Sequence, residues 1–251
     1  MSKLKNKVAV VTGGNTGIGL AAAKDFIALG AKVIITGRDQ QKIDNAINLL
    51  GSNATGFQAD VSNIREIENL VSIVSSEFGK LDVLLVNAGV SYQEPIGELT
   101  EEIFDTISDI NFKGAVFTTE KFIPILNDGA SIIHLTSVSA YTYATGTSIY
   151  SASKAALTAY SKSAAVELAH RKIRVNTVAP SMTETDMINR GALGNEEVHN
   201  FLKSKFMPFK RFAKPEEIAK LISFLASDDA SFISGSEYTI DSGASVNAVR
   251  L

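Results

Sequence analysis

The stretch Val8-Ala-Val-Val-Thr-Gly-Gly-Asn-Thr-Gly-Ile-Gly19 joins a short apolar run to a cluster of glycines. Its β-branched residues favour a strand over Val8–Thr12, and a helical pattern starts at Ile18. Glycine lets the backbone turn sharply and approach a ligand, while a helix N-terminus offers free N–H groups and partial positive charge. Strand, glycine turn and helix together predict a phosphate site here, in preference to a tight turn without a ligand.

The same alternation of strand and helix continues along the chain. Further strands are expected at residues 32–36, 55–58, 83–87, 131–136, 174–178 and 237–240. Helices are expected at residues 18–29, 40–50, 64–78, 101–126, 150–170, 198–206 and 215–226. Nearly continuous apolar strands are typical of a parallel sheet with helices on both faces. The sequence therefore predicts one α/β domain over residues 1–251, with a doubly wound parallel sheet of about seven strands.

Composition excludes several classes of function. The 251 residues carry a formal net charge of -3, which argues against binding to nucleic acid or to an anionic membrane. There is no cysteine, and the three histidines lie far apart in sequence, so neither thiolate catalysis nor a metal site is expected. The basic first seven residues run directly into a strand that is too short for a signal-peptide core. A cytoplasmic location is therefore expected.

The pattern loosens over residues 181–213, directly after the strand expected at 174–178. Polar and glycine breaks surround one short amphipathic stretch at 198–206. Ligands of α/β proteins bind at the carboxyl ends of the strands, and long loops in compact domains are usually functional. This segment is therefore predicted to be a lid over a substrate, although an ordinary surface excursion would give the same pattern.

Tyr150 and Lys154 stand four residues apart in an expected helix, so their side chains share one face. A nearby cation favours the phenolate form and lowers the pKa of a tyrosine, which lets it exchange protons near neutrality. Such a tyrosine can protonate the alkoxide formed when a ketone is reduced, and can accept a proton in the reverse direction. An amphipathic helix with a surface lysine would produce the same spacing by chance.

Two other residues, Ser137 and Asn111, make it less credible that the spacing of Tyr150 and Lys154 arose by chance. Ser137 directly follows the strand expected at 131–136, thirteen residues before Tyr150, and Asn111 interrupts the helix expected at 101–126. With the pattern Gly13-x3-Gly17-x-Gly19, these residues resemble the short-chain dehydrogenase/reductase family, in its single-domain Rossmann-type branch of carbonyl and 3-oxoacyl reductases. The resemblance spans nearly the whole chain.

The resemblance implies a nicotinamide cofactor that carries the hydride, and it assigns roles to four residues. Tyr150 would be the general acid and base. Lys154 would bind the nicotinamide ribose and depress the pKa of the tyrosine. Ser137 would orient the carbonyl and stabilise its developing negative charge, and Asn111 would hold a water in a proton path to the lysine.

The cofactor residues follow from the same resemblance. They are Gly13, Asn15, Thr16, Gly17, Ile18, Gly19, Arg38, Asp60, Val61, Asn87, Ala88, Gly89, Tyr150, Lys154, Pro180, Thr183 and Thr185. Two departures from the family pattern stand out: Ser181 replaces a usual glycine, and Asp241-Ser-Gly243 replaces Asp-Gly-Gly. Neither departure removes a reacting group.

The choice between the two nicotinamide cofactors depends on the second strand. Gly37 ends it, where a carboxylate would bind the adenosine ribose hydroxyls, and Arg38 follows with a planar cation suited to a phosphate. NADP(H) is therefore favoured. Arg38 could instead stack on adenine at the start of a helix, and Thr16 stands where some NADP enzymes carry a second cation, so NAD(H) remains the alternative.

With no cluster of cations near the expected pocket, a neutral ketone or secondary alcohol is favoured. Candidate substrate contacts are Ser139, Tyr143, Met182, Met187 and Phe201. Two other functions remain open, an NAD-linked alcohol or sugar dehydrogenase and a dinucleotide-sensing protein without turnover. Relatives of this length are mostly homotetramers, which is the expected assembly here.

Overall fold

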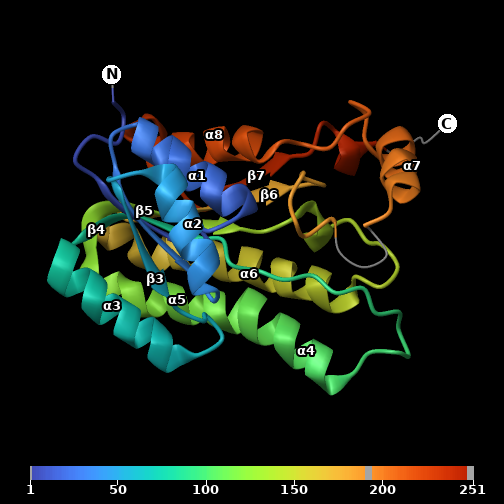
Figure 1. The fold of residues 1–251 in the computed structure, drawn as a ribbon, viewed down its shortest axis with the longest axis horizontal. Helices are drawn as coiled ribbons and strands as arrows, with labels where there is room; N and C mark the ends of the chain where they lie inside the picture. Colours follow the sequence, from blue (N-terminus) through green and yellow to red (C-terminus); the bar gives the residue numbers. More distant parts are fainter. Residues whose placement is uncertain (1, 190–193, 248–251) are drawn as a thin grey trace.

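The computed structural model describes residues 2–189 and 194–247, and in this part of the chain seven strands form one central sheet (Figure 1). The strands are β1 (Val8–Thr12), β2 (Lys32–Gly37), β3 (Ala54–Gln58), β4 (Leu81–Val86), β5 (Leu126–Leu135), β6 (Arg174–Pro180) and β7 (Glu237–Ile240). Their order is β3-β2-β1-β4-β5-β6-β7, and every pairing is parallel. The predicted parallel α/β sheet is thus confirmed. The strand order reverses between β1 and β4, which is where α/β folds bind ligands.

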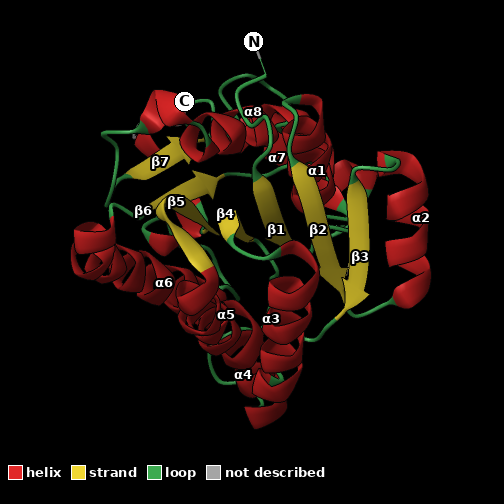
Figure 2. Ribbon diagram, turned by 90° about the vertical axis from the view of Figure 1, so that its left-hand side faces the viewer, coloured by secondary structure: helices red, strands yellow, loops and turns green. Residues whose placement is uncertain are grey.

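Helices cover both faces of the sheet (Figure 2). One face carries α1 (Gly17–Ala28), α2 (Gln40–Leu50) and α8 (Pro215–Ala226). The other face carries α3 (Ile64–Phe78), α5 (Gly114–Phe122) and α6 (Ser148–Glu167), and α4 (Glu101–Ser108) leads into α5. Two buried apolar clusters lie in these interfaces, one around Phe26 and Ile35 and one around Phe122 and Leu157. The alternation of apolar strands and amphipathic helices is the cause of this layering.

The expected helix over residues 101–126 is wrong as a single element. After α4, residues Asp109–Lys113 form a π-helical turn, α5 follows, and Ile123–Ile125 form a 3-10 turn. Pro124 lacks an N–H donor and cannot continue the helix, so Leu126 already begins β5. The cause of the π turn is a side chain that bonds outside the helix, described below for Asn111.

The described parts of the segment over residues 181–213 lie beyond the carboxyl edge of the sheet, where α7 (Glu196–Phe206) stands apart from the two layers (Figure 1). Residues 190–193 of the predicted lid lie outside the described residues. On either side of them the chain is anchored by a parallel bridge between Thr183 and Ala213. Among the described helices, none is long and apolar enough to cross a membrane.

Candidate active site

The glycine turn after β1 leaves the first turn of α1 open to a ligand. Gly17 adopts φ 54°, a left-handed conformation that favours glycine, and a Cβ on Gly19 would stand 2.3 Å from the carbonyl oxygen of Gly13. Thr16 is the N-cap residue, but its side chain makes no capping hydrogen bond, and no acidic residue occupies the first helical turn. The N-terminus of α1 therefore fits a pyrophosphate, as the sequence predicts.

Asn87, Ala88 and Gly89 join the ends of β4 and β1. The Nδ2 of Asn87 donates to the carbonyl oxygens of Thr12 (2.9 Å) and Gly13 (3.0 Å). The backbone N–H groups of Asn87 and Ala88 donate to Thr12 Oγ1 at 3.0 and 3.2 Å. Thr12 was not among the predicted site residues. Its signal is a hydroxyl at the carboxyl end of an otherwise apolar strand.

Asn111 lies in the π-helical turn, and its fully buried side chain bonds to a loop instead of to the helix. Its Oδ1 accepts from the N–H of Val90 (2.8 Å) and its Nδ2 donates to the carbonyl oxygen of Val90 (2.8 Å). The same Nδ2 donates to Ser153 Oγ at 3.3 Å. An asparagine side chain that bonds to the backbone of another segment distorts its own helix, because these bonds compete with regular helical geometry. π-Helical turns of this kind are frequent at functional sites. Asn111 thereby fixes the loop after β4 against α6.

Gly89 brings the asparagine and the lysine to one place. A Cβ on Gly89 would stand 3.3 Å from Asn111 Oδ1 and 3.4 Å from Lys154 Nζ. Lys154 is 4% exposed, and its Nζ donates to the carbonyl oxygen of Leu135 at 2.9 Å. Burial disfavours the ammonium and lowers the pKa of Lys154 to about 8. The lysine is therefore held rigidly and can release a proton near neutral pH.

Tyr150 stands one helical turn before Lys154, with its ring centroid 5.9 Å from Lys154 Nζ. Burial raises the pKa of Tyr150, and a hydrogen bond with Ser137 offsets this only in part. Burial is the largest influence on the pKa of Tyr150 here, and the depression of that pKa by Lys154 stays a prediction. The phenol is held protonated at neutral pH, which suits a proton donor.

Ser137 follows β5 and is 8% exposed. Its Oγ accepts from the N–H of Ser139 (3.1 Å) and donates to the carbonyl oxygen of Pro180 (3.5 Å). Together with its hydrogen bond to Tyr150, these contacts place two hydroxyl groups side by side above the end of β5. Two such hydroxyls can both bond to one carbonyl oxygen.

At the end of β2 the structure has a hollow of about 330 Å³, and one of the predicted adenosine contacts, Arg38, lies in its wall. Arg38 is exposed and lines it beside Ser62, as do the carboxylate residues Glu102, Asp105 and Asp109. Among the described residues Arg38 forms no ion pair. Asn15 lies against Gly37, where an added Cβ would meet the Asn15 amide at 2.8 Å. This arrangement leaves a free guanidinium, and no room for a carboxylate unless Asn15 moves.

Two further predicted cofactor residues follow β3. Asp60 Oδ1 accepts from the N–H (2.9 Å) and the hydroxyl (2.7 Å) of Ser62. Val61 is buried, and a Cβ on Gly114 would stand 2.5 Å from the Val61 carbonyl oxygen. The structure thus packs this loop against the start of α5, one element away from Asn111.

The predicted nicotinamide segment, Pro180 to Thr185, leaves β6 and turns back over the glycine turn. Thr183 is 4% exposed and its Oγ1 donates to the carbonyl oxygen of Ser181 at 3.0 Å. Thr185 Cγ2 would stand 3.1 Å from a Cβ added to Gly17. The segment therefore reaches from the tyrosine end of the site to the phosphate end. The serine that replaces the family's glycine, Ser181, donates to Met207 Sδ at 3.7 Å.

The predicted substrate contacts are less coherent. Ser139 and Met182 are partly buried, whereas Tyr143 and Phe201 are 83% and 55% exposed and Met187 is 38% exposed. The Phe201 ring packs on Phe206 at 5.9 Å. Tyr143 lines a hollow of about 580 Å³ together with Ser148, Ser151 and Ala152 of α6, and Tyr150 is not among the residues that line it. These positions stay predictions. Within the described ranges, no cluster of three metal-ligating side chains occurs.

Comparison with known proteins identifies the family. A family model described as enoyl-(acyl carrier protein) reductase matches residues 13–245. Oxidoreductase asL5 of Sarocladium schorii is 40% identical over 245 residues, which is 97% of each protein. Dehydrogenase/reductase SDR family member 4 of Oryctolagus cuniculus is 35% identical over 247 residues, 96% of this chain and 94% of the relative. A short-chain dehydrogenase/reductase mutant of Serratia marcescens has a solved structure with TM-score 0.90 and 31% identity, covering 97% and 99% of the two chains.

The chain therefore belongs to the short-chain dehydrogenase/reductase family. It is a nicotinamide-dependent oxidoreductase with a Rossmann-like α/β fold. The resemblance read from Gly13, Asn111, Ser137, Tyr150 and Lys154 is thus confirmed at the level of the family.

Proposed function

We propose that the chain catalyses the NADPH-dependent reduction of a neutral ketone to a secondary alcohol, with Tyr150 as the proton donor. The observation that supports this most is the position of Lys154. Its Nζ is buried, bonded to Leu135, and next to both Gly89 and Asn111. A lysine on the outer surface of a helix, with no role in a site, would have its ammonium group in contact with water. Burying one at a cost in stability is typical of a functional site.

The nicotinamide, when bound, supplies the hydride. The side chains do the rest. Ser137 Oγ donates a hydrogen bond to the substrate carbonyl, and Tyr150 Oη donates its proton to the oxygen as negative charge develops there. Lys154, whose pKa is lowered to about 8, stands ready to return a proton toward the tyrosine. Asn111 holds the loop after β4, and thereby the place of Gly89 beside the lysine.

The preference for NADP(H) rests on Arg38 and Asn15. Arg38 is exposed at the end of β2 without an ion-pair partner among the described residues, so its guanidinium is free to bind a phosphate in a bidentate manner. Asn15 lies over Gly37, where a ribose-binding carboxylate would otherwise stand. The acidic residues that line the same hollow weigh on the other side, because they oppose a bound phosphate unless Arg38 neutralises them.

The test is a panel of ketones, alcohols and one enoyl thioester, each assayed with NADPH, NADP, NADH and NAD. Ketone reduction with a preference for NADPH supports the proposal. Turnover only with NAD and an alcohol or sugar favours the NAD-linked dehydrogenase, and reduction of the enoyl thioester alone moves the chemistry from a C=O to a C=C bond. Saturable binding of cofactor without turnover across the panel favours a dinucleotide sensor. Homotetramer assembly and a cytoplasmic location also remain predictions.

A further inference from the structure

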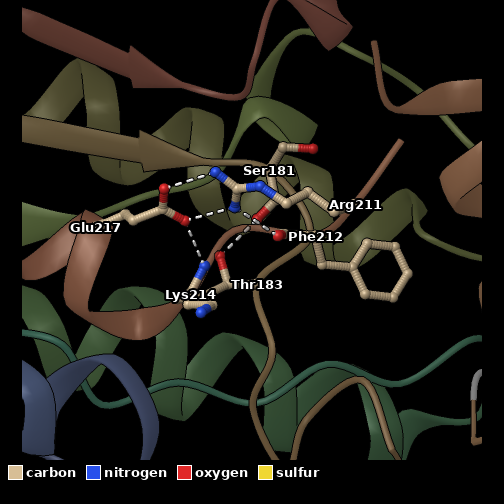
Figure 3. Close-up of polar contacts among 6 residues, drawn as sticks. All are labelled: Ser181, Thr183, Arg211, Phe212, Lys214 and Glu217. Atoms are coloured by element: carbon tan, nitrogen blue, oxygen red, sulfur yellow. Dashed lines mark hydrogen bonds and ion pairs between the residues drawn. The ribbon is translucent and has the colours of Figure 1, made fainter. Parts of the chain in front are cut away.

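Three segments of the chain meet at the start of α8 (Figure 3). They are the strap Met182–Thr185, the stretch that leads from α7 into α8, and the first turn of α8 itself. The strap pairs with Ala213 through two backbone hydrogen bonds. The N–H of Glu184 donates to the Ala213 carbonyl oxygen at 2.8 Å, and the N–H of Ala213 donates to the Met182 carbonyl oxygen at 3.0 Å. The position of the strap therefore depends on what holds Ala213.

An ion pair between Arg211 and Glu217 fixes the backbone on both sides of Ala213. Arg211 donates from Nη1 and Nη2 to the two carboxylate oxygens of Glu217, at 2.6 and 2.7 Å. The same carboxylate accepts from the N–H of Lys214 at 2.8 Å, and Arg211 Nη1 also donates to the carbonyl oxygen of Phe212 at 3.0 Å. The backbone on both sides of Ala213 is thus tied into one bidentate ion pair. Bidentate pairs fix geometry better than single contacts.

The charges persist under all ordinary conditions. The hydrogen bond from Arg211 lowers the pKa of Glu217 to about 2, and the Glu217 carboxylate raises the pKa of Arg211. Glu184, which belongs to the strap, adds a smaller attraction for Arg211. Arg211 and Glu217 therefore both stay ionised at neutral pH. Arg211 also attracts the strap directly, through the charge of Glu184.

Two further contacts connect this cluster to the glycine turn. Thr185, at the end of the strap, stands against Gly17. Helix α8 packs on α1, the helix that the glycine turn opens, and Lys220 forms an ion pair with Asp25 between them. The strap thus meets the glycine turn at Thr185, and through Ala213 and α8 it is linked to α1, the helix that the glycine turn opens. Near Ala213, which also packs against the apolar core, the side chains of Arg211 and Glu217 add a bidentate ion pair to this connection.

We infer that Arg211 is a positioning residue, which holds the strap Met182–Thr185 in the conformation that binds the nicotinamide end of the cofactor. The inference rests on the proposed function. A strap that is already ordered lowers the entropy cost of binding, whereas a loose strap must be ordered at that moment. Arg211 therefore strengthens the binding of the whole cofactor without touching it. It leaves the binding of the adenosine half unchanged, because that half lies at Arg38 and Asp60.

The test measures two dissociation constants by fluorescence or calorimetric titration of the full chain, one for NADPH and one for adenosine 2′,5′-bisphosphate, which lacks the nicotinamide. The variant Arg211→Met is expected to weaken NADPH binding by about three- to fivefold, the upper range for an exposed pair. Its affinity for adenosine 2′,5′-bisphosphate is expected to stay at the wild-type value. Glu217→Gln, which keeps an acceptor for the Lys214 N–H, is expected to give a smaller loss of the same kind.

The matched control is Arg171→Met. Arg171 also binds a carboxylate, Asp128, and the backbone carbonyl oxygens of Ile123 and Leu126, but it lies just before β6, at the opposite edge of the sheet. It is expected to leave both dissociation constants unchanged. The double variant Arg211→Met with Glu217→Gln should lose no more than Arg211→Met alone, since the pair acts as a unit.

Unchanged NADPH affinity in Arg211→Met would overturn the inference. So would an equal loss for NADPH and for adenosine 2′,5′-bisphosphate, which would mark a general effect on the fold. A wild-type chain that binds neither NADPH nor NADH would instead overturn the proposed function, so the two failures are distinguishable.

Discussion

The two ends of the candidate site are held in contrasting ways. At the tyrosine end, Asn111 and Lys154 are 0% and 4% exposed and bond to backbone groups of the sheet and its loops. At the strap, the side chains of Arg211 and Glu217 are 46% and 43% exposed and bond mainly to each other. Buried polar contacts in a low dielectric are costly to break, whereas exposed ion pairs contribute little each. If both proposals hold, the reacting groups are fixed by buried contacts, whereas the affinity for the cofactor is adjusted by an exposed ion pair.

Among the changes proposed for the buried part of the site, Lys154→Met is expected to have the largest effect on activity. Carbonyl reduction is expected to fall by about a thousandfold, within the range for a group that supports proton transfer. At the same time the free energy of unfolding at pH 7 is expected to rise by about 1 kcal/mol, because a buried ammonium destabilises the folded state. Urea unfolding and steady-state rates measure the two effects.

The pH dependence of that stability gain has a definite sign. The folded pKa of Lys154, about 8, lies below its ordinary value of 10.5, so the penalty is fully present below pH 8 and disappears as the pH rises to 10.5. The gain of the Lys154→Met variant should therefore shrink over this range. A gain that grows with pH, or a variant less stable than wild type at pH 7, contradicts a strained buried lysine.

Arg38→Leu tests the adenosine end, which is exposed like the strap but meets the ligand directly. The dissociation constant of NADPH is expected to rise by about 10- to 100-fold, the range for charge-assisted hydrogen bonds, while that of NADH changes little. Titration with each cofactor measures this, with Arg171→Leu as the control arginine. An equal loss for NADPH and NADH would show that Arg38 contacts something common to both.

His134 is a second buried titratable group, and we expect it to make the stability of the protein depend on pH. It is fully buried between Thr119 Oγ1 (2.8 Å) and Ser161 Oγ (2.7 Å), and burial, helped by the charge of Lys154, lowers its pKa to about 3. Because the unfolded chain takes up a proton below pH 6.5 and the folded chain does not, stability is lost as pH falls from 6.5 toward 3.

The loss assigned to His134 is about 2 kcal/mol at pH 5 relative to pH 7. His134→Asn should flatten the pH dependence of unfolding by that amount, whatever its stability at pH 7. His170→Asn is the control, because His170 is exposed. A wild-type acid loss that survives in His134→Asn would assign the titration to other groups.

The same contrast explains what the sequence could predict. The strands, the glycine turn and the shared face of Tyr150 and Lys154 follow from periodicity and spacing. Ser137 and Asn111 were predicted only through the resemblance to the family. The interruption at Asn111 was expected, but its cause, the pairing with Val90 twenty-one residues away, has no local signal. The pairing of Thr183 with Ala213 has none either. Neither does the raised pKa of Tyr150, because burial depends on the whole fold.

The measurement that tests the site most directly compares Tyr150→Phe with the wild type in single-turnover reduction of a ketone and in NADPH titration. The phenol is the proposed proton donor and its ring is kept in the variant. Reduction should therefore fall by about 10²- to 10⁴-fold, while the dissociation constant of NADPH stays within about twofold. A variant that keeps more than about a tenth of the wild-type rate would contradict the assignment of Tyr150 as the proton donor.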